Sequence, residues 1–269
     1  MSDHNLSYVK NIVAAEGYVP NDPKFYMDTS RMARYPEVTL WDFIENNPDK
    51  EWVEFCENNG ANLTDEHNAE DYFIGNFDAI SSKKDDFIDF MMNNKETCQK
   101  KFYEARPYHT GVNDFTEDMP MKCGYNWANC CEYNWGLHGD SRFKLKEILG
   151  KEFFEQINMD YDTCLPRLLA YLPGQTLPFH FDYLGNWCRE NANLNPDPAT
   201  RRCDMGTLTR YLMFITPWHW GHMLQMDNTF YPKWKSGDMY EIPMMVYHLS
   251  TNAGMSLKLS MSLTGVIKK

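Results

Sequence analysis

The strongest constraint on the fold is the pattern of the last hundred or so residues, where short apolar runs alternate with turn signals. The clearest turns are Leu-Pro-Gly at 172–174 and Ser-Gly-Asp at 236–238. Apolar runs of this length, bounded by Gly and Pro, are typical of strands rather than helices. The expected strands are 164–172, 177–183, 207–216, 238–248 and 255–265. Residues 159–269 are therefore expected to form an all-β core of jelly-roll or barrel type.

The last of these runs alternates polar and aliphatic side chains with a period of two. Successive side chains of a strand point to opposite faces, so this alternation places the hydroxyls and one lysine on one face. The polar members are Ser256, Lys258, Ser260 and Ser262, and the aliphatic members are Leu257, Leu259, Met261 and Leu263.

The first half of the chain has a different character, with helical spacing in three places. Helices are expected within 37–59, 85–103 and 141–157, and 104–139 is expected to be long and irregular. Residues 1–158 are thus predicted to form a mainly helical extension packed on the jelly roll. The predicted fold class is α+β, with both parts in one compact unit.

Charge and hydropathy exclude some classes of partner. The formal net charge is −12, from 26 basic and 38 acidic residues, which disfavours a nucleic-acid partner. No apolar run reaches the length needed to span a bilayer. The N-terminus lacks the basic and apolar regions of a signal peptide, so a cytoplasmic location is expected.

Candidate metal ligands stand out in Phe179-His180-Phe181-Asp182. On an extended strand, His180 and Asp182 would point to the same side and could hold one ion. His248 follows far downstream, near the end of another β-like run. Two histidines and one carboxylate leave coordination positions open, which is the facial triad of non-haem Fe(II) oxygenases.

A cation lies at a suitable place for a dicarboxylate cosubstrate. Lys258 comes ten residues after His248, and Ser260 shares its strand face. Tyr171, nine residues before His180, could add a hydrogen bond to the same carboxylate. Arg210 precedes an apolar strand and has two interpretations: binding an anionic group of substrate or cosubstrate, or pairing with an acidic surface residue.

Taken in order, these residues resemble the 2-oxoglutarate/Fe(II) oxygenase superfamily, and Lys258 at its spacing from His248 is similar to the prolyl 4-hydroxylase-like branch. The resemblance covers about 160–267. It implies His180, Asp182 and His248 as metal ligands and 2-oxoglutarate as cosubstrate, with its far carboxylate on Lys258, Tyr171 and Ser260. The implied activity is hydroxylation of an amino acid, small metabolite or peptidyl side chain, with release of succinate and CO2. Ascorbate is the expected accessory reductant.

Two other functions use the same fold. A cupin-like metal-dependent isomerase or epimerase would need no lysine at position 258, and a non-catalytic binding module would need no intact triad. Packing is favoured over substrate contact for the aromatic side chains expected near the mouth. These are Trp187, Trp218 and Trp220. For His222, a structural role or a substrate hydrogen bond is expected rather than a second metal site.

Overall fold

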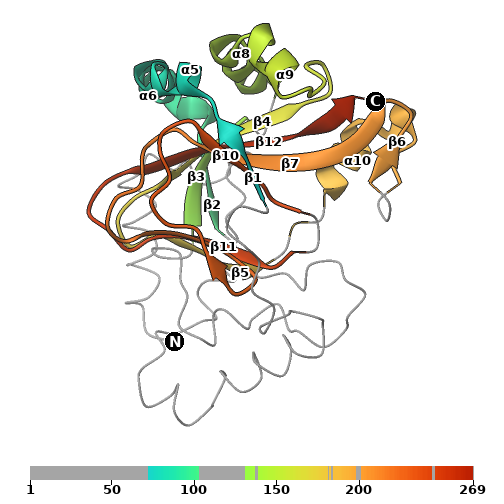
Figure 1. Cartoon of the computed structure of the whole chain (residues 1–269). Helices are drawn as coiled ribbons and strands as arrows, with labels where there is room; N and C mark the ends of the chain where they lie inside the picture. Colours follow the sequence, from blue (N-terminus) through green and yellow to red (C-terminus); the bar gives the residue numbers. More distant parts are fainter. Residues whose placement is uncertain are drawn as a thin grey trace, which may run out of the picture.

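A computed structural model describes residues 72–102, 131–136, 139–180, 182, 184–197, 201–243 and 246–268. The helices predicted within 37–59 lie outside the described residues, as does most of the segment 104–139. Neighbouring strands are antiparallel and form two sheets, as in a jelly roll (Figure 1).

The large sheet has eight strands and the small sheet has four. In spatial order the large sheet contains β1 (Phe73–Asn76), β10 (Asp238–Glu241), β7 (Gly206–Phe214), β12 (Lys258–Lys268), β4 (Leu165–Tyr171), β3 (Cys131–Trp135) and β2 (Gln99–Phe102), and β6 (Arg202–Cys203) pairs with β7. The small sheet contains β5 (Thr176–His180), β11 (His248–Asn252), β8 (His222–Met226) and β9 (Thr229–Phe230).

The two sheets pack face to face around a shared apolar cluster. Leu169 and Phe214 of the large sheet meet Leu177 and Leu224 of the small sheet in this cluster. The predicted α+β jelly roll is confirmed. The prediction was wrong for 238–248, because this run is two strands in different sheets. The chain leaves β10 at Pro243, which has no N–H to offer a ladder, and enters the small sheet at His248.

The N-terminal half contributes strands as well as helices. β1 pairs with β10, and β3 pairs with β4, so both extend the large sheet. The expectation of an irregular segment over 104–139 was wrong for 131–135. The local composition of Cys, Asn and aromatics resembles a loop, but pairing with the edge of β4 imposes an extended conformation.

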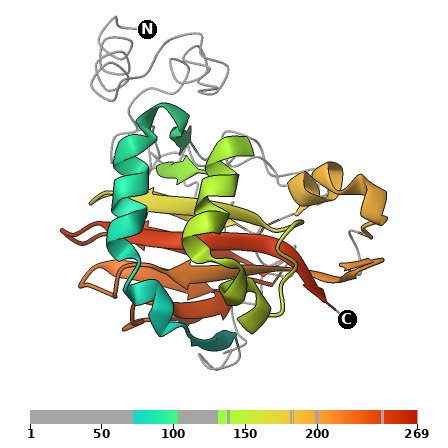
Figure 2. The ribbon, with the colours of Figure 1, turned by 90° about the horizontal axis from the view of Figure 1, so that it is seen from above.

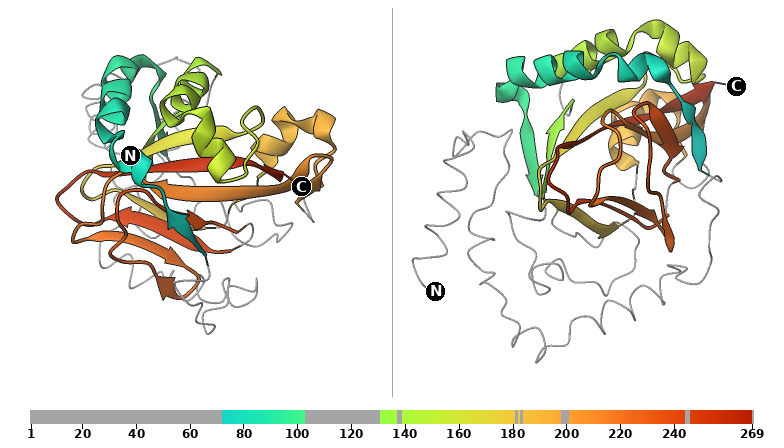
Figure 3. Two further views of the ribbon diagram at one scale, coloured as in Figure 1. Left: turned by 45° about the horizontal axis from the view of Figure 1, so that its top comes forward. Right: turned by 60° about the vertical axis from the view of Figure 1, so that its left-hand side comes forward.

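The helices cover the outer face of the large sheet, on the side away from the small sheet (Figures 2 and 3). They are α5 (Asp78–Ser81), α6 (Lys84–Asn93), α8 (Gly139–Leu149) and α9 (Lys151–Gln156). The helix predicted over 141–157 is two helices, because Gly150 between them adopts a φ of 82°. The helix predicted over 85–103 ends at Asn93, and the chain continues through η1 (Lys95–Thr97) into β2.

Apolar side chains from these helices meet the outward side chains of the sheet. Phe87, Leu145 and Phe154 belong to the same buried cluster as Leu168 of β4 and Met261 of β12. Burying one such side chain stabilises the fold by about 1.5–3 kcal/mol. In the described part of the chain, none of the helices combines the length and apolarity that crossing a bilayer requires.

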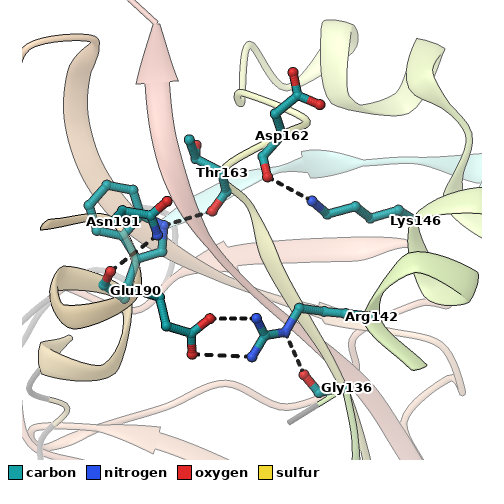
Figure 4. A network of polar contacts seen from close by, with 8 residues as sticks. Gly136, Arg142, Lys146, Asp162, Thr163, Glu190 and Asn191 are labelled. Carbon is teal, nitrogen blue, oxygen red and sulfur yellow. Dashed lines mark hydrogen bonds and ion pairs between the residues drawn. The ribbon is translucent and has the colours of Figure 1, made fainter. Parts of the chain in front are cut away.

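A network of polar contacts fixes α10 (Gly185–Glu190) near the end of the large sheet (Figure 4). Arg142 of α8 forms a two-point ion pair with Glu190 and donates from Nε to the carbonyl of Gly136 at 2.9 Å. The indole Nε1 of Trp187 donates to the carbonyl of Thr163 at 2.8 Å. These contacts hold the Trp187 ring in place against the interior.

Candidate metal centre

Three side chains with metal-ligand chemistry converge between the two sheets. His180 ends β5 and His248 begins β11, and the two are register partners in the small sheet. Asp182 lies two residues beyond the end of β5. One ligand atom from each of the three lies within 4.8 Å of the others. The structure therefore brings together all three predicted ligands, although the strand predicted over 177–183 ends at His180.

The orientation of the histidines suits a common ion. The ring centroids of His180 and His248 are 4.3 Å apart. Nδ1 of His248 lies 3.0 Å from the carbonyl oxygen of Val246, and a carbonyl can only accept, so this nitrogen carries the proton. In the neutral form of the ring, Nε2 then keeps its lone pair, and this atom lies 3.5 Å from the Asp182 carboxylate. Fixing the tautomer in this way is common for metal-bound histidine.

Arg210 holds the carboxylate of the triad. Its guanidinium forms an ion pair with Asp182, and its Nε donates to the Thr264 hydroxyl at 3.0 Å. Burial alone would raise the pKa of Asp182, but the charge of Arg210, followed by those of His248 and His180, lowers it below its usual value. Of the two interpretations for Arg210, the structure shows an acidic partner, but one inside the site rather than on the surface.

The triad opens into a cavity of about 130 Å³, which is room for a few water molecules or part of a small ligand. Its apolar walls include Leu177, Leu224 and Ile242, and Trp187 also lines it. Polar side chains make up much of the remaining wall. They are Glu132, Asn134, Arg167, Tyr171, Arg210, Ser250, Ser260, Ser262 and Thr264.

Lys258 is buried behind this wall and is not among the described residues that line the cavity. Its ammonium donates to the carbonyl of Met223 at 2.5 Å, the hydroxyl of Ser250 at 2.7 Å and the carbonyl of Thr251 at 3.3 Å. These three acceptors match its three donors. Burial lowers the pKa of Lys258 to about 7. Because Ser250 lines the cavity, one hydroxyl separates the cation from it.

Tyr171 and Ser260, the other predicted cosubstrate residues, do line the cavity. The Tyr171 hydroxyl donates to the Glu132 carboxylate at 2.6 Å, so its one proton is directed there. Burial, and then the nearby charge of Glu132, raise the pKa of Tyr171 well above its usual value. In this structure the phenol offers the cavity lone pairs rather than a proton.

Sequence reasoning missed the polar residues of β3 and β4 in the cavity. Arg167 follows the same period of two as Leu169 and Tyr171, so the expected strand could have revealed it. Glu132 and Asn134 alternate with Tyr133 and Trp135, but this short pattern lies in a segment with the composition of a loop. The signal for these two residues was too short to separate from the surrounding composition.

The aromatic residues expected near the mouth divide into two groups. Trp187 is buried and lines the cavity. Trp218 donates from Nε1 to the carbonyl of His222 at 2.8 Å, and Nε2 of His222 lies 3.2 Å from the carbonyl of Ser256. Trp220 is 84% exposed. None of Trp218, Trp220 and His222 is among the described cavity-lining residues.

The fold and the triad define an α+β jelly roll with a candidate metal centre between its sheets. No family model matches this sequence, and no curated protein matches it.

Several solved structures are similar in fold. A prolyl-4-hydroxylase from Pseudomonas putida is 10% identical, with 71% of this chain and 87% of that chain covered and a TM-score of 0.39. A predicted oxalate decarboxylase from Thermotoga maritima is 9% identical, with 51% and 81% covered and a TM-score of 0.29. A cupin 2 conserved barrel domain protein from Salinispora arenicola is 11% identical, with 38% and 63% covered and a TM-score of 0.25. At these values the likeness concerns the fold and carries no argument about the site.

Proposed function

We propose that this protein is an Fe(II)- and 2-oxoglutarate-dependent oxygenase that hydroxylates a small molecule or a peptidyl side chain. The observation that supports this most is the convergence of His180, Asp182 and His248 within 4.8 Å at the edge of a cavity. Two imidazoles and one carboxylate fit a ferrous ion and leave three coordination positions for other ligands. When bound, the ion supplies the redox chemistry that couples decarboxylation of 2-oxoglutarate to oxygen transfer.

The residues around the triad would position the ligands and exclude water. Val246 keeps the Nε2 lone pair of His248 available, and Arg210 keeps Asp182 ionised and oriented. The apolar wall of Leu177, Leu224 and Ile242 lowers the local dielectric, which strengthens these electrostatic contacts.

The predicted cosubstrate subsite requires a local rearrangement. The far carboxylate of 2-oxoglutarate would replace one of the neutral acceptors of Lys258, with Ser250 and Ser260 beside it. A charge-assisted bond to a carboxylate is stronger than one to a carbonyl, which favours this exchange. Tyr171 would contribute only if its proton turned away from Glu132.

The arrangement of Lys258 and Tyr171 supports a second candidate, a metal-dependent isomerase or epimerase with no cosubstrate. Lys258 does not line the cavity, and Met223, Ser250 and Thr251 accept its three donors. The Tyr171 proton is directed to Glu132. A protein without 2-oxoglutarate would need neither group to change partners.

One spectroscopic experiment separates the two candidates. Fe(II) is added without oxygen, followed by 2-oxoglutarate, and the visible spectrum is recorded. The oxygenase predicts a weak charge-transfer band from the chelate, whereas the isomerase predicts metal binding without the band. Folded wild-type protein that binds Fe(II) but shows no band would contradict the proposed function.

Substitutions of the predicted metal-binding residues complete the test. His180→Ala and Asp182→Ala should each reduce succinate formation in the absence of substrate to background, because two ligands hold the ion too weakly. Asp162→Ala is the matched control, since Asp162 is exposed and lies outside the cavity lining. It should retain the wild-type rate.

A further inference from the structure

Two adjacent positions on the cavity face of β3 form an acceptor pair that the metal centre does not use. Glu132 and Asn134 are two residues apart on this strand, so they share a face, and both line the cavity that contains the triad. Glu132 is 4% exposed and Asn134 is 1% exposed. Both side chains are therefore shielded from bulk solvent. Their hydrogen-bond partners must come from the surrounding residues or from a molecule in the cavity.

Asn134 has a buried oxygen without a partner. Its Nδ2 donates to Oε1 of Glu132 at 3.2 Å, and a carboxylate can only accept, which fixes the orientation of the amide. Oδ1 therefore faces away from Glu132, and it accepts no hydrogen bond from any group in the described part of the chain. Leaving a buried acceptor of this kind without a hydrogen bond is unfavourable, so a donor from a ligand would stabilise it.

The hydrogen bonds that Glu132 accepts in the described residues come from neutral groups. In the described residues, the groups that donate to its carboxylate are the Tyr171 hydroxyl and the Asn134 amide. Lys258, the register partner of Tyr171, directs its donors to Met223, Ser250 and Thr251 instead. Two other cations, Arg167 and Arg210, line the same cavity, and Arg210 pairs with Asp182. A buried carboxylate is strongly disfavoured without a cation, so a ligand with a positive charge would relieve this cost.

We infer that Glu132 and Asn134 bind a protonated amine of the substrate. An ammonium offers three donors, and the Asn134 oxygen and the remaining lone pairs of Glu132 accept them. This inference rests on the proposed function, because it assigns the bound amine to the substrate of that enzyme. It narrows the substrate class to amine-bearing molecules such as free amino acids or lysine-like side chains. The net charge of −12 also favours a cationic ligand over an anionic one.

The test uses three probes of similar size and different charge, which are butylamine, 1-butanol and butyrate. Binding to the metal-free full-length chain is measured at pH 7 by ligand-detected NMR titration, so that iron chemistry plays no part. The wild type should bind butylammonium at least about tenfold more tightly than either other probe, the range expected for charge-assisted hydrogen bonds.

Substitutions test whether Glu132 and Asn134 are the residues that bind the amine. Glu132→Gln keeps the shape and removes the charge, and it should reduce the preference for butylammonium at least about tenfold. Asn134→Leu should weaken butylammonium binding and leave butanol binding unchanged or stronger. Glu155→Gln is the control, because Glu155 is exposed on α9, and it should keep the wild-type preference. Circular dichroism checks that each variant is folded.

The outcomes separate this inference from the proposed function. Equal binding of the three probes by the wild type, or an unchanged preference in folded Glu132→Gln, would overturn the amine subsite even if the charge-transfer band is present. A clear preference that depends on Glu132 would support the subsite even if the band is absent and the oxygenase proposal fails.

Discussion

The two faces of β12 have the same backbone and opposite chemistry. Leu259, Met261 and Leu263 point outward and belong to the apolar cluster beneath the helices. Ser260 and Ser262 point inward and line the cavity. All five side chains are at most 7% exposed. The alternation along this strand therefore separates a dry core from a polar cavity, rather than a core from solvent.

The comparison shows that the two faces meet different physical requirements. The outer face needs only close packing, because aliphatic side chains have no directional partners. The inner face buries polar groups, which need directional partners, and specific contacts supply partners to two of them. Lys258 has three acceptors, and Thr264 accepts from Arg210. We expect substitutions outside to change stability and substitutions inside to change binding.

The largest expected effect is on the outer face. Leu263→Ala should lower the free energy of unfolding by about 2–5 kcal/mol, because it leaves a cavity in the packed layer. The neighbouring inward substitution Ser262→Ala should cost about 1 kcal/mol or less. Urea denaturation measures both. A similar loss of unfolding free energy in the two variants would contradict the expectation that the outer face contributes more to stability than the inner face.

Arg210 should have the next largest effect, on metal binding. Arg210→Met removes the partner of Asp182, so the carboxylate loses both its orientation and the charge that lowers its pKa. Loss of such a supporting contact usually costs about 10–100-fold in metal affinity. Calorimetric titration with Mn(II) or Co(II) measures this. Arg202→Met, an exposed arginine of β6, is the control and should bind like the wild type.

Lys258 should affect the cosubstrate rather than the metal. Lys258→Met keeps the length of the side chain and removes the cation, so the 2-oxoglutarate requirement should rise at least about tenfold. Metal affinity should stay at the wild-type level, because Lys258 contacts none of the triad residues in the described contacts. Loss of metal binding in a folded variant would contradict the proposed role of this lysine.

The smallest expected effect is the pH dependence of cosubstrate binding. Burial lowers the pKa of Lys258 to about 7, so the amine is charged below pH 7 and becomes neutral above it. The affinity for 2-oxoglutarate should fall about fivefold between pH 7 and pH 8, as the charged fraction falls. Titrations at the two pH values measure this. Lys258→Met should show a flat profile over the same interval.

Much of the fold could be predicted from the sequence, because the relevant signals are local. Turn residues and apolar runs predicted the strands that became β4, β5, β7 and β12. The period of two along 256–263 predicted which side chains share a face. The spacing of His180 and Asp182, with His248 on a later strand, was enough to nominate the three residues that the structure brings within 4.8 Å.

Tertiary contacts decided what local patterns could not. β3 is extended because it pairs with β4, and this pairing places Glu132 and Asn134 in the cavity. The run 238–248 divides between two sheets. The alternation along β12 placed Lys258 on the inner face, but it could not reveal that Met223, Ser250 and Thr251 accept the hydrogen bonds of this lysine. A strand's periodicity is a property of its own backbone, so the sequence determines which side chains share a face. The partners that those side chains meet come from distant segments, and only the packed sheets bring them together.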